Sequence, residues 1–137
     1  MSYPAEDFVA YLEAQGIGRR MSTLFTPSDQ GAFDGRPLAA VIRETSVATS
    51  PDVTVDADRL ALFISVSGTF GQQGEHTVAD LAFRIYNELR LLLDVTIDGT
   101  LYYCVQAQGP PAHAGYDEFG RTVYELTVDI YRYIGGN

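Results

Sequence analysis

The stretch YDEFGRTVYELTVDIYRYI, residues 116 to 134, predicts a long strand late in the chain. Alternate residues on one side are Thr122, Tyr124, Leu126, Val128 and Ile130. Those on the other side are Arg121, Val123, Glu125, Thr127, Asp129, Tyr131 and Tyr133. Such alternation is typical of a strand with one buried face. We therefore expect the first set to face the core, and the tyrosines of the second set need a different explanation.

Other segments show the same two-residue period. RLALFISVS (59–67) predicts the clearest strand, PLAAVIR (37–43) a second, and STLFT (22–26) a short extended piece. The dipeptide Asp98-Gly99 divides 94–109 into two runs, which predicts a hairpin. In its second arm we expect one face to carry Leu101, Tyr103, Val105 and Ala107. Segments 27–35, 45–58 and 112–120 are predicted loops, with room for a short strand at 53–55.

Two helices are predicted. Residues 4–15 have Pro4 in the first turn and Gly16 as a stop. Residues 78–93 carry an apolar stripe in steps of three and four, formed by Val78, Leu81, Ala82, Ile85, Leu89 and Leu92. Thr77 with Asp80 has the pattern of a helix cap, residues 68–76 are a predicted glycine-rich loop, and Leu91 to Leu93 would bury the helix end.

Strands arranged around one long helix favour an α+β fold. We expect a single domain over residues 1–137, with a mainly antiparallel (mixed) sheet and two helices packed on one face. The length of 137 residues suits one core. The N-terminus lacks the pattern of a signal peptide and the apolar runs are too short to cross a bilayer, so we expect a soluble intracellular product.

The net charge of −9 rests on 18 acidic residues against 9 basic ones, all of them arginine. This balance disfavours a protein that grips nucleic-acid phosphates. The single cysteine, Cys104, cannot form an internal disulfide, and its place in a predicted strand favours packing over catalysis. His76 and Asp80 are too few for a closed zinc site. The glycines of 68–74 have neither Walker nor Rossmann spacing. We therefore expect no enzyme, no cofactor and no metal.

The order of motifs in the second half resembles the minor-capsid and tail-terminator family, the head–tail joining proteins of long-tailed bacteriophages. A Tyr-x-x-Leu helix end at 86–89 precedes a VTIDGTLY hairpin at 95–102. A Gln-x-Pro loop at 108–110, a GYDEFGR turn at 115–121 and a terminal strand at 125–131 follow. The first half resembles the family more loosely, and its 45–58 segment is longer than is usual there.

The resemblance implies a structural virion protein without turnover. Members similar to it form a hexameric ring that caps the tail tube and joins it to the head connector. The implied partners are further copies of the chain, the tail tube protein and the connector or stopper protein, with DNA only as transiting cargo and no membrane. The implied location is the virion tail or neck, after assembly in the bacterial cytoplasm.

A ring subunit also explains tyrosines on the outer side of the last strand. Tyrosine is favoured in interfaces because it combines a large contact area with a polar tip. The candidate subunit-interface residues are Tyr131, Tyr133, Asp129 and Arg121. Tyrosines on an outer strand face also fit plain strand propensity, and the sequence does not decide between the two.

Three alternatives stay open at this point. The chain fits another neck, tail-completion or minor-capsid component equally well. A different class, a dimeric small-molecule or peptide-binding α+β module, would use the tyrosines to line a pocket. An enzyme using His113 with Asp117 or Glu118 is a weaker third alternative.

Overall fold

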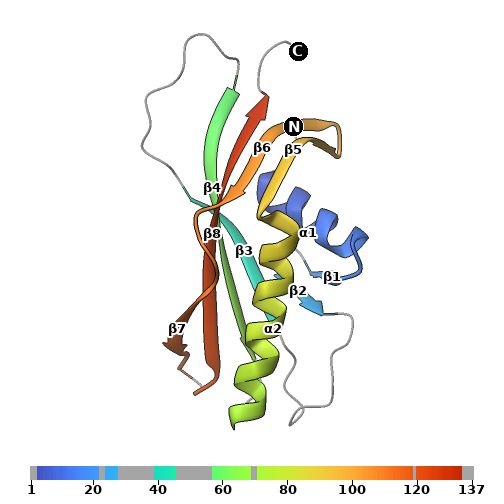
Figure 1. Ribbon diagram of the computed structural model, residues 1–137. Helices are drawn as coiled ribbons and strands as arrows, with labels where there is room; N and C mark the ends of the chain where they lie inside the picture. Colours follow the sequence, from blue (N-terminus) through green and yellow to red (C-terminus); the bar gives the residue numbers. More distant parts are fainter. Residues whose placement is uncertain are drawn as a thin grey trace.

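The computed structural model describes residues 3–21, 24–27, 39–45, 57–68, 71–118 and 120–133. In these ranges the chain forms two helices and one sheet of eight strands (Figure 1). The helices are α1 (Pro4–Ala14) and α2 (Gly71–Leu89). The strands are β1 (Gly18–Met21), β2 (Leu24–Pro27), β3 (Ala39–Thr45), β4 (Ala57–Gly68), β5 (Leu91–Ile97), β6 (Thr100–Ala107), β7 (Ala112–Tyr116) and β8 (Thr122–Tyr133). The predicted α+β fold is confirmed, and every pairing between these strands is antiparallel.

Strand β8 holds the sheet together. The strand order is β1-β2-β3-β4-β8-β6-β5, with β7 also paired to β8. On one side β8 pairs with β4 along its whole length, from Thr122 opposite Gly68 to Tyr133 opposite Ala57. On the other side β7 covers the first part of β8 and β6 the second. Figure 1 shows β4 and β8 running together along the molecule.

Both helices pack on the same face of the sheet, as predicted (Figure 1). The predicted inner stripe of β8 is confirmed, because Leu126, Val128 and Ile130 are buried. The helices contribute the buried side chains Ala5, Phe8, Val9, Leu12, Val78, Leu81, Ala82, Ile85 and Leu89. Each large apolar side chain buried here stabilises the fold by about 1.5–3 kcal/mol. The core therefore lies between the helices and one sheet face.

Helix α1 begins and ends close to where the sequence predicts. Pro4 is its first residue, where the missing N–H costs no hydrogen bond. Gly16 follows the helix with a φ of 83°, in the left-handed region that glycine tolerates. The Ile17 N–H donates to the Leu12 carbonyl at 3.0 Å and the Gly16 N–H donates to the Glu13 carbonyl at 2.9 Å. This pair of bonds is a Schellman motif, which satisfies the last carbonyls of the helix.

Helix α2 differs from its prediction at both ends. It begins at Gly71 rather than at residue 78, so Thr77 lies inside the helix and is not its cap. Glycine weakens a helix by only about 1 kcal/mol, which continuing helical turns outweigh. At the other end the helix stops at Leu89, and residues 91–93 belong to β5. A run of consecutive leucines fits a helix or a strand, and periodicity alone does not separate the two.

The predicted face of the β6 arm holds for Val105 and Ala107 and is wrong for Tyr103. Tyr102 and Val105 are buried, and the register of β6 against β8 shifts between Tyr102 and Cys104. An extra residue in one strand reverses the alternation beyond it. The shift turns Tyr103 to the side away from the helices and leaves Tyr102 in the core. The Asp98-Gly99 turn itself is confirmed, with φ values of 50° and 81°.

A second correction concerns the predicted loop at 112–120. Its first part is strand β7, which pairs with β8 from Ala112 opposite Glu125 to Tyr116 opposite Thr122. The last strand accordingly begins at Thr122 rather than at residue 116. The chain turns between β7 and β8 with the Arg121 N–H donating to Asp117 Oδ1 at 2.9 Å. Main-chain pairing with β8 outweighs the weak strand propensity of this polar stretch.

Some predictions fall outside the described residues: the greater part of the 27–35 loop, the possible strand at 53–55, and residues 22–23 and 37–38 of predicted strands. In the part of the chain that the structure describes, no helix is both long enough and apolar enough to cross a membrane.

Candidate assembly surface

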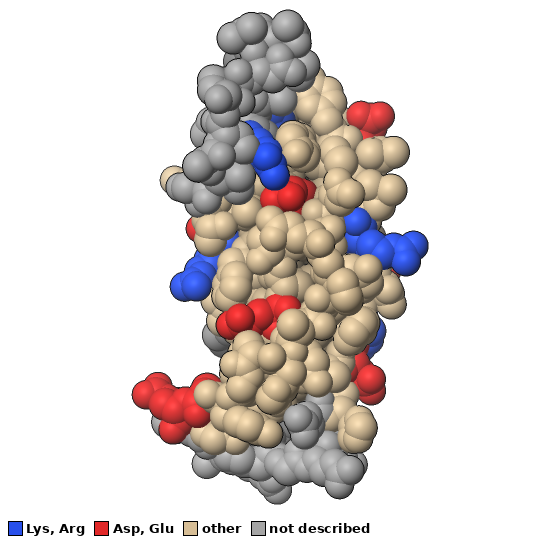
Figure 2. All heavy atoms as spheres, turned by 60° about the vertical axis from the view of Figure 1, so that its left-hand side comes forward, with Lys and Arg blue, Asp and Glu red and all other residues tan. Residues whose placement is uncertain are grey.

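The sheet face opposite the helices, called the outer face below, is not covered by either helix. The strand register assigns to it Val41, Arg43, Arg59, Ala61, Phe63, Ser65, Cys104, Gln106, Val123, Glu125, Thr127, Asp129 and Tyr131. Figure 2 brings the side away from the helices forward and shows a mostly uncharged surface with separate basic and acidic groups. The outer face therefore mixes apolar, aromatic and a few charged side chains.

Two of the predicted interface residues lie together on β8, between β4 and β6, in what is called the central group below. The Arg59 guanidinium carbon lies 5.6 Å from the centroid of the Tyr131 ring. Arg59 Nη2 donates to Asp129 Oδ2 at 3.5 Å, and Gln108 Nε2 donates to Asp129 Oδ1 at 3.1 Å. An ion pair this exposed contributes at most about 1 kcal/mol. The ion pair places the Arg59 guanidinium over the ring of Tyr131.

Tyr133 lies next to this group with a second tyrosine. Its ring packs edge-on against Tyr103, with centroids 5.9 Å apart and an interplanar angle of 85°. The side chain of Tyr133 is 38% exposed. Tyr103 reaches this position because of the bulge in β6. Sequence alternation alone placed Tyr103 on the same face as Val105 and Ala107, so this pairing was missed.

Arg121 lies at the other end of β8. It precedes Thr122, whereas Tyr133 is the last residue of the strand, and a strand of this length spans roughly 35–40 Å. Arg121 Nε donates to Asp117 Oδ2 at 2.8 Å across the β7–β8 turn. The structure therefore brings Asp129, Tyr131 and Tyr133 together and places Arg121 on a separate part of the surface.

The outer face continues onto two leucines that sequence analysis assigned to a helix end. Leu91 and Leu93 in β5 are 57% and 65% exposed. They lie opposite Gln106 and Cys104 of β6, which in turn lie opposite Asp129 and Tyr131. In a strand, alternate residues of a leucine run must face outward. Assigning residues 91–93 to a strand would have revealed this exposed pair.

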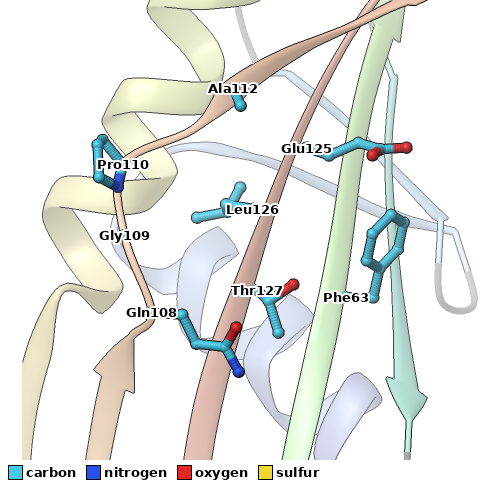
Figure 3. Close-up of a pocket in the computed structure, with 8 residues that line it drawn as sticks. All are labelled: Phe63, Gln108, Gly109, Pro110, Ala112, Glu125, Leu126 and Thr127. Atoms are coloured by element: carbon cyan, nitrogen blue, oxygen red, sulfur yellow. The ribbon is translucent and has the colours of Figure 1, made fainter.

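A hollow of about 320 Å³ opens where the chain passes from β6 to β7. Its lining residues are Phe63, Gln108, Gly109, Pro110, Ala112, Glu125, Leu126 and Thr127. Figure 3 shows it bounded by the 108–110 segment on one side and by β8 on the other. The guanidinium of Arg43 stacks on Phe63, 4.8 Å from the ring centroid. The hollow combines apolar walls with the Glu125 carboxylate.

The other candidate residues lie apart from the central group. His113 Nε2 is 3.0 Å from Thr122 Oγ1, and its ring packs against those of Tyr116 and Tyr124. His76 is exposed on α2. In the described ranges no three histidine, cysteine or acidic side chains cluster as metal ligands. Cys104 is partly buried on the outer face, directly opposite Tyr131.

One polar pair lies in the core. Tyr102 is fully buried, and its hydroxyl donates a hydrogen bond to Asp7 Oδ2, which is itself 3% exposed. Burial, followed by the hydrogen bond to Asp7, raises the pKa of Tyr102. The hydroxyl therefore stays protonated and acts as a donor to the carboxylate. The sequence alone does not predict this pair, because its members are 95 residues apart.

Comparison with known proteins finds no match: no family model, no curated protein and no solved structure is similar to this chain. The described fold is α+β. Any function must therefore be argued from the outer face, its edge and the chemistry of the side chains there.

Proposed function

We propose that this protein is a structural subunit of a tailed-phage virion, a tail terminator whose copies form a hexameric ring. The ring would cap the tail tube and join it to the head connector. The observation that carries the proposal is the uncovered outer face, where Tyr131, Tyr133 and Tyr103 adjoin the exposed Leu91 and Leu93. The motif order of the second half, which resembles that family, supports the same role.

The chemistry of the outer face suits a protein contact. Interface cores are enriched in tyrosine and arginine and depleted in lysine and acids. A ring built from head-to-tail contacts needs two different patches on each subunit. The group around Asp129, Tyr131 and Tyr133 supplies one patch. The end of β8 near Arg121, at the far end of the strand, is available as part of the second.

The proposed partners follow from that role. They are other copies of this chain, the tail tube protein and the connector or stopper protein at the head. The protein would reside in the virion neck after assembly in the bacterial cytoplasm. DNA would pass through the ring without binding, and the net charge of −9 suits a lumen that does not retain phosphates.

The hollow beside Pro110 favours a second candidate function. A concave site with apolar walls and one carboxylate suits a small cationic ligand or a peptide side chain. On this alternative the protein is a dimeric binding module rather than a ring subunit. It predicts a rise in melting temperature with such a ligand, and Glu125→Gln should abolish that rise.

The test of the ring role is the native mass of the purified protein over a wide concentration range, followed by electron microscopy. We expect a hexamer seen as a ring with an open centre, alone or on added tail tubes. Species no larger than a dimer, with tubes present, would contradict the proposal. If rings form but do not bind tube ends, the result would favour the alternative that the protein is another neck or tail-completion component.

A further inference from the structure

Strand β5 is an edge of the sheet, since among the described strands it pairs only with β6. Edge strands of proteins that stay monomeric are normally protected by charges, prolines or covering segments. This one begins with three leucines, and Leu91 and Leu93 are 57% and 65% exposed. The edge is therefore suited to pairing with another chain.

The backbone of β5 presents hydrogen-bonding groups to the open side at these same leucines. The Ala107 N–H donates to the Arg90 carbonyl at 3.1 Å, so the backbone of Arg90 faces β6. In an antiparallel ladder, successive residues point their N–H and C=O groups to alternate sides. The backbone groups of Leu91 and Leu93 consequently point away from β6, toward the position of an added strand.

We propose that β5 pairs antiparallel with the same strand of a second copy of this chain, about a two-fold axis at Leu92. In that register Leu91 lies opposite Leu93 of the partner subunit. Arg90 and Asp94 of the partner subunit flank this pair, Asp94 with a φ of 51° at which the extended run ends, and both of these residues are exposed. The segment Arg-Leu-Leu-Leu-Asp, residues 90–94, is thus complementary to itself when two copies run in opposite directions.

The charges select this register among those that the backbone allows. With the axis at Asp94, two Asp94 carboxylates would face each other. With the axis at Leu91, Asp94 would lie beyond the start of the partner's strand, next to the end of its α2, and would lose Arg90 as its neighbour. Like charges directly opposite each other destabilise a strand pair, whereas opposite charges stabilise it. An axis at Leu93 would place Arg90 opposite Thr96 of the partner subunit and lose both ion pairs.

The contact closes at two copies, because a two-fold interface uses the same surface on both subunits. It goes beyond the proposed ring and does not depend on it. Two short strand segments bury less than the roughly 1,600 Å² of a standard interface, so we expect a weak dimer. The dimer should form at high protein concentration and low ionic strength, where two exposed ion pairs are least screened.

Disulfide trapping tests the register. In a Cys104→Ser background, Leu92→Cys places two thiols on the axis, in a pair whose Cα atoms would be about 4.5 Å apart. Leu93→Cys is the control: its side chain position is more exposed, but the two copies would lie roughly 8 Å apart, too far for a disulfide. Under mild oxidation we expect about tenfold more linked dimer from Leu92→Cys than from Leu93→Cys. Equal linkage, faster linkage of Leu93→Cys, or none would overturn the proposal.

A charge change tests the same contact without touching the core. Arg90→Glu should weaken the dimer about tenfold in sedimentation equilibrium, because both ion pairs become repulsive. Arg84→Glu, an equal charge change at an exposed site on α2, should leave it unchanged. Equal effects of the two variants would overturn the proposal, and this result decides the matter if Leu92→Cys does not fold. Ring formation by Arg90→Glu, scored separately by microscopy, tests the proposed function alone.

Discussion

The Tyr102 hydroxyl donates a hydrogen bond to the Asp7 carboxylate, and this bond joins β6 to α1 in the middle of the core. It depends on the β6 bulge, which keeps Tyr102 inside while Tyr103 faces outward. The Tyr102 ring also packs edge-on against Phe8, with centroids 4.9 Å apart. One polar and one aromatic contact therefore join the first helix to strand β6.

Removing the hydroxyl should be costly. Tyr102→Phe leaves the ring in place but takes one donor from a carboxylate that is 3% exposed. Hydrogen bonds to a buried charged group contribute about 1.5–3 kcal/mol, and we expect a loss of that size in the free energy of unfolding. Urea denaturation measures it. Tyr116→Phe, at a site 65% exposed, is the control and should change stability by less than about 0.5 kcal/mol.

The same bond predicts a loss of stability in alkali. Burial, and then the Asp7 hydrogen bond, raise the pKa of Tyr102 above its ordinary value of 10.0. The folded state therefore holds this proton more tightly than the unfolded state. The resulting stabilisation is complete below pH 10 and is lost as the pH rises above it, by up to about 1.4 kcal/mol per pH unit. Unfolding measured from pH 9 to 11.5 should show a slope that Tyr102→Phe reduces; an unchanged slope would contradict the assignment.

Two neighbouring leucines should respond differently to truncation. Leu89 is fully buried at the end of α2, and Leu89→Ala should cost about 2–5 kcal/mol. Leu93 is 65% exposed in β5, so Leu93→Ala should cost less than about 1 kcal/mol. Chemical denaturation of both variants compares them directly. Similar large losses would mean that residues 91–93 are buried, as the helical prediction required.

Alanine substitutions at two glycines should distinguish the effect of backbone strain from that of steric contact. A Cβ added at Gly99 or at Gly109 would meet no atom within 4 Å. Only Gly99 has a φ in the left-handed region, at 81°. Gly99→Ala should therefore lose about 1 kcal/mol, whereas Gly109→Ala should be neutral or slightly stabilising. Thermal unfolding of the two variants tests this, and equal shifts would count against the Asp98-Gly99 turn.

Assembly should depend on the central tyrosine of the outer face. Tyr131→Ser removes an aromatic side chain that is held by Arg59 and packs nothing into the core. We expect self-association to weaken at least about tenfold, as is typical of interface hot spots. Tyr3→Ser, at the exposed N-cap of α1 and outside both proposed patches, is the matched control. Light scattering that shows identical association of the two variants would place the subunit contact elsewhere.

The elements that were predicted correctly are those determined by residues close together in the sequence. The alternation in β4 and β8 and the Asp98-Gly99 turn lie within short windows of sequence. The same holds for the start of α1 at Pro4 and its stop at Gly16. These features depend on backbone dihedral angles and on the side-chain period, which neighbouring residues determine.

The features that were missed depend on distant partners. Strand β7 exists because β8 pairs with it, and nothing in its polar sequence indicates a strand. The bulge at Tyr103 is favoured by the burial of Tyr102 against Asp7, which is 95 residues away. The exposure of Leu93 follows from the position of β5 at the sheet edge. Alternation placed all four candidate interface residues on one face, but Arg121 precedes β8 and lies at the opposite end from Asp129, Tyr131 and Tyr133.

Because β8 lies in the middle of the sheet and comes last in the chain, it also determines when the strands can pair during synthesis. Strand β4 ends at residue 68 and its partner β8 begins at residue 122, so a ribosome adds the 53 residues 69–121 between them. During that interval the apolar side of β4 has no neighbour on the β8 side, whereas the β5–β6 hairpin can form at once. Long-range pairing of this kind slows folding. We expect nascent chains arrested before residue 122 to be protease-sensitive in β4, and protection there would show that β4 finds another partner first.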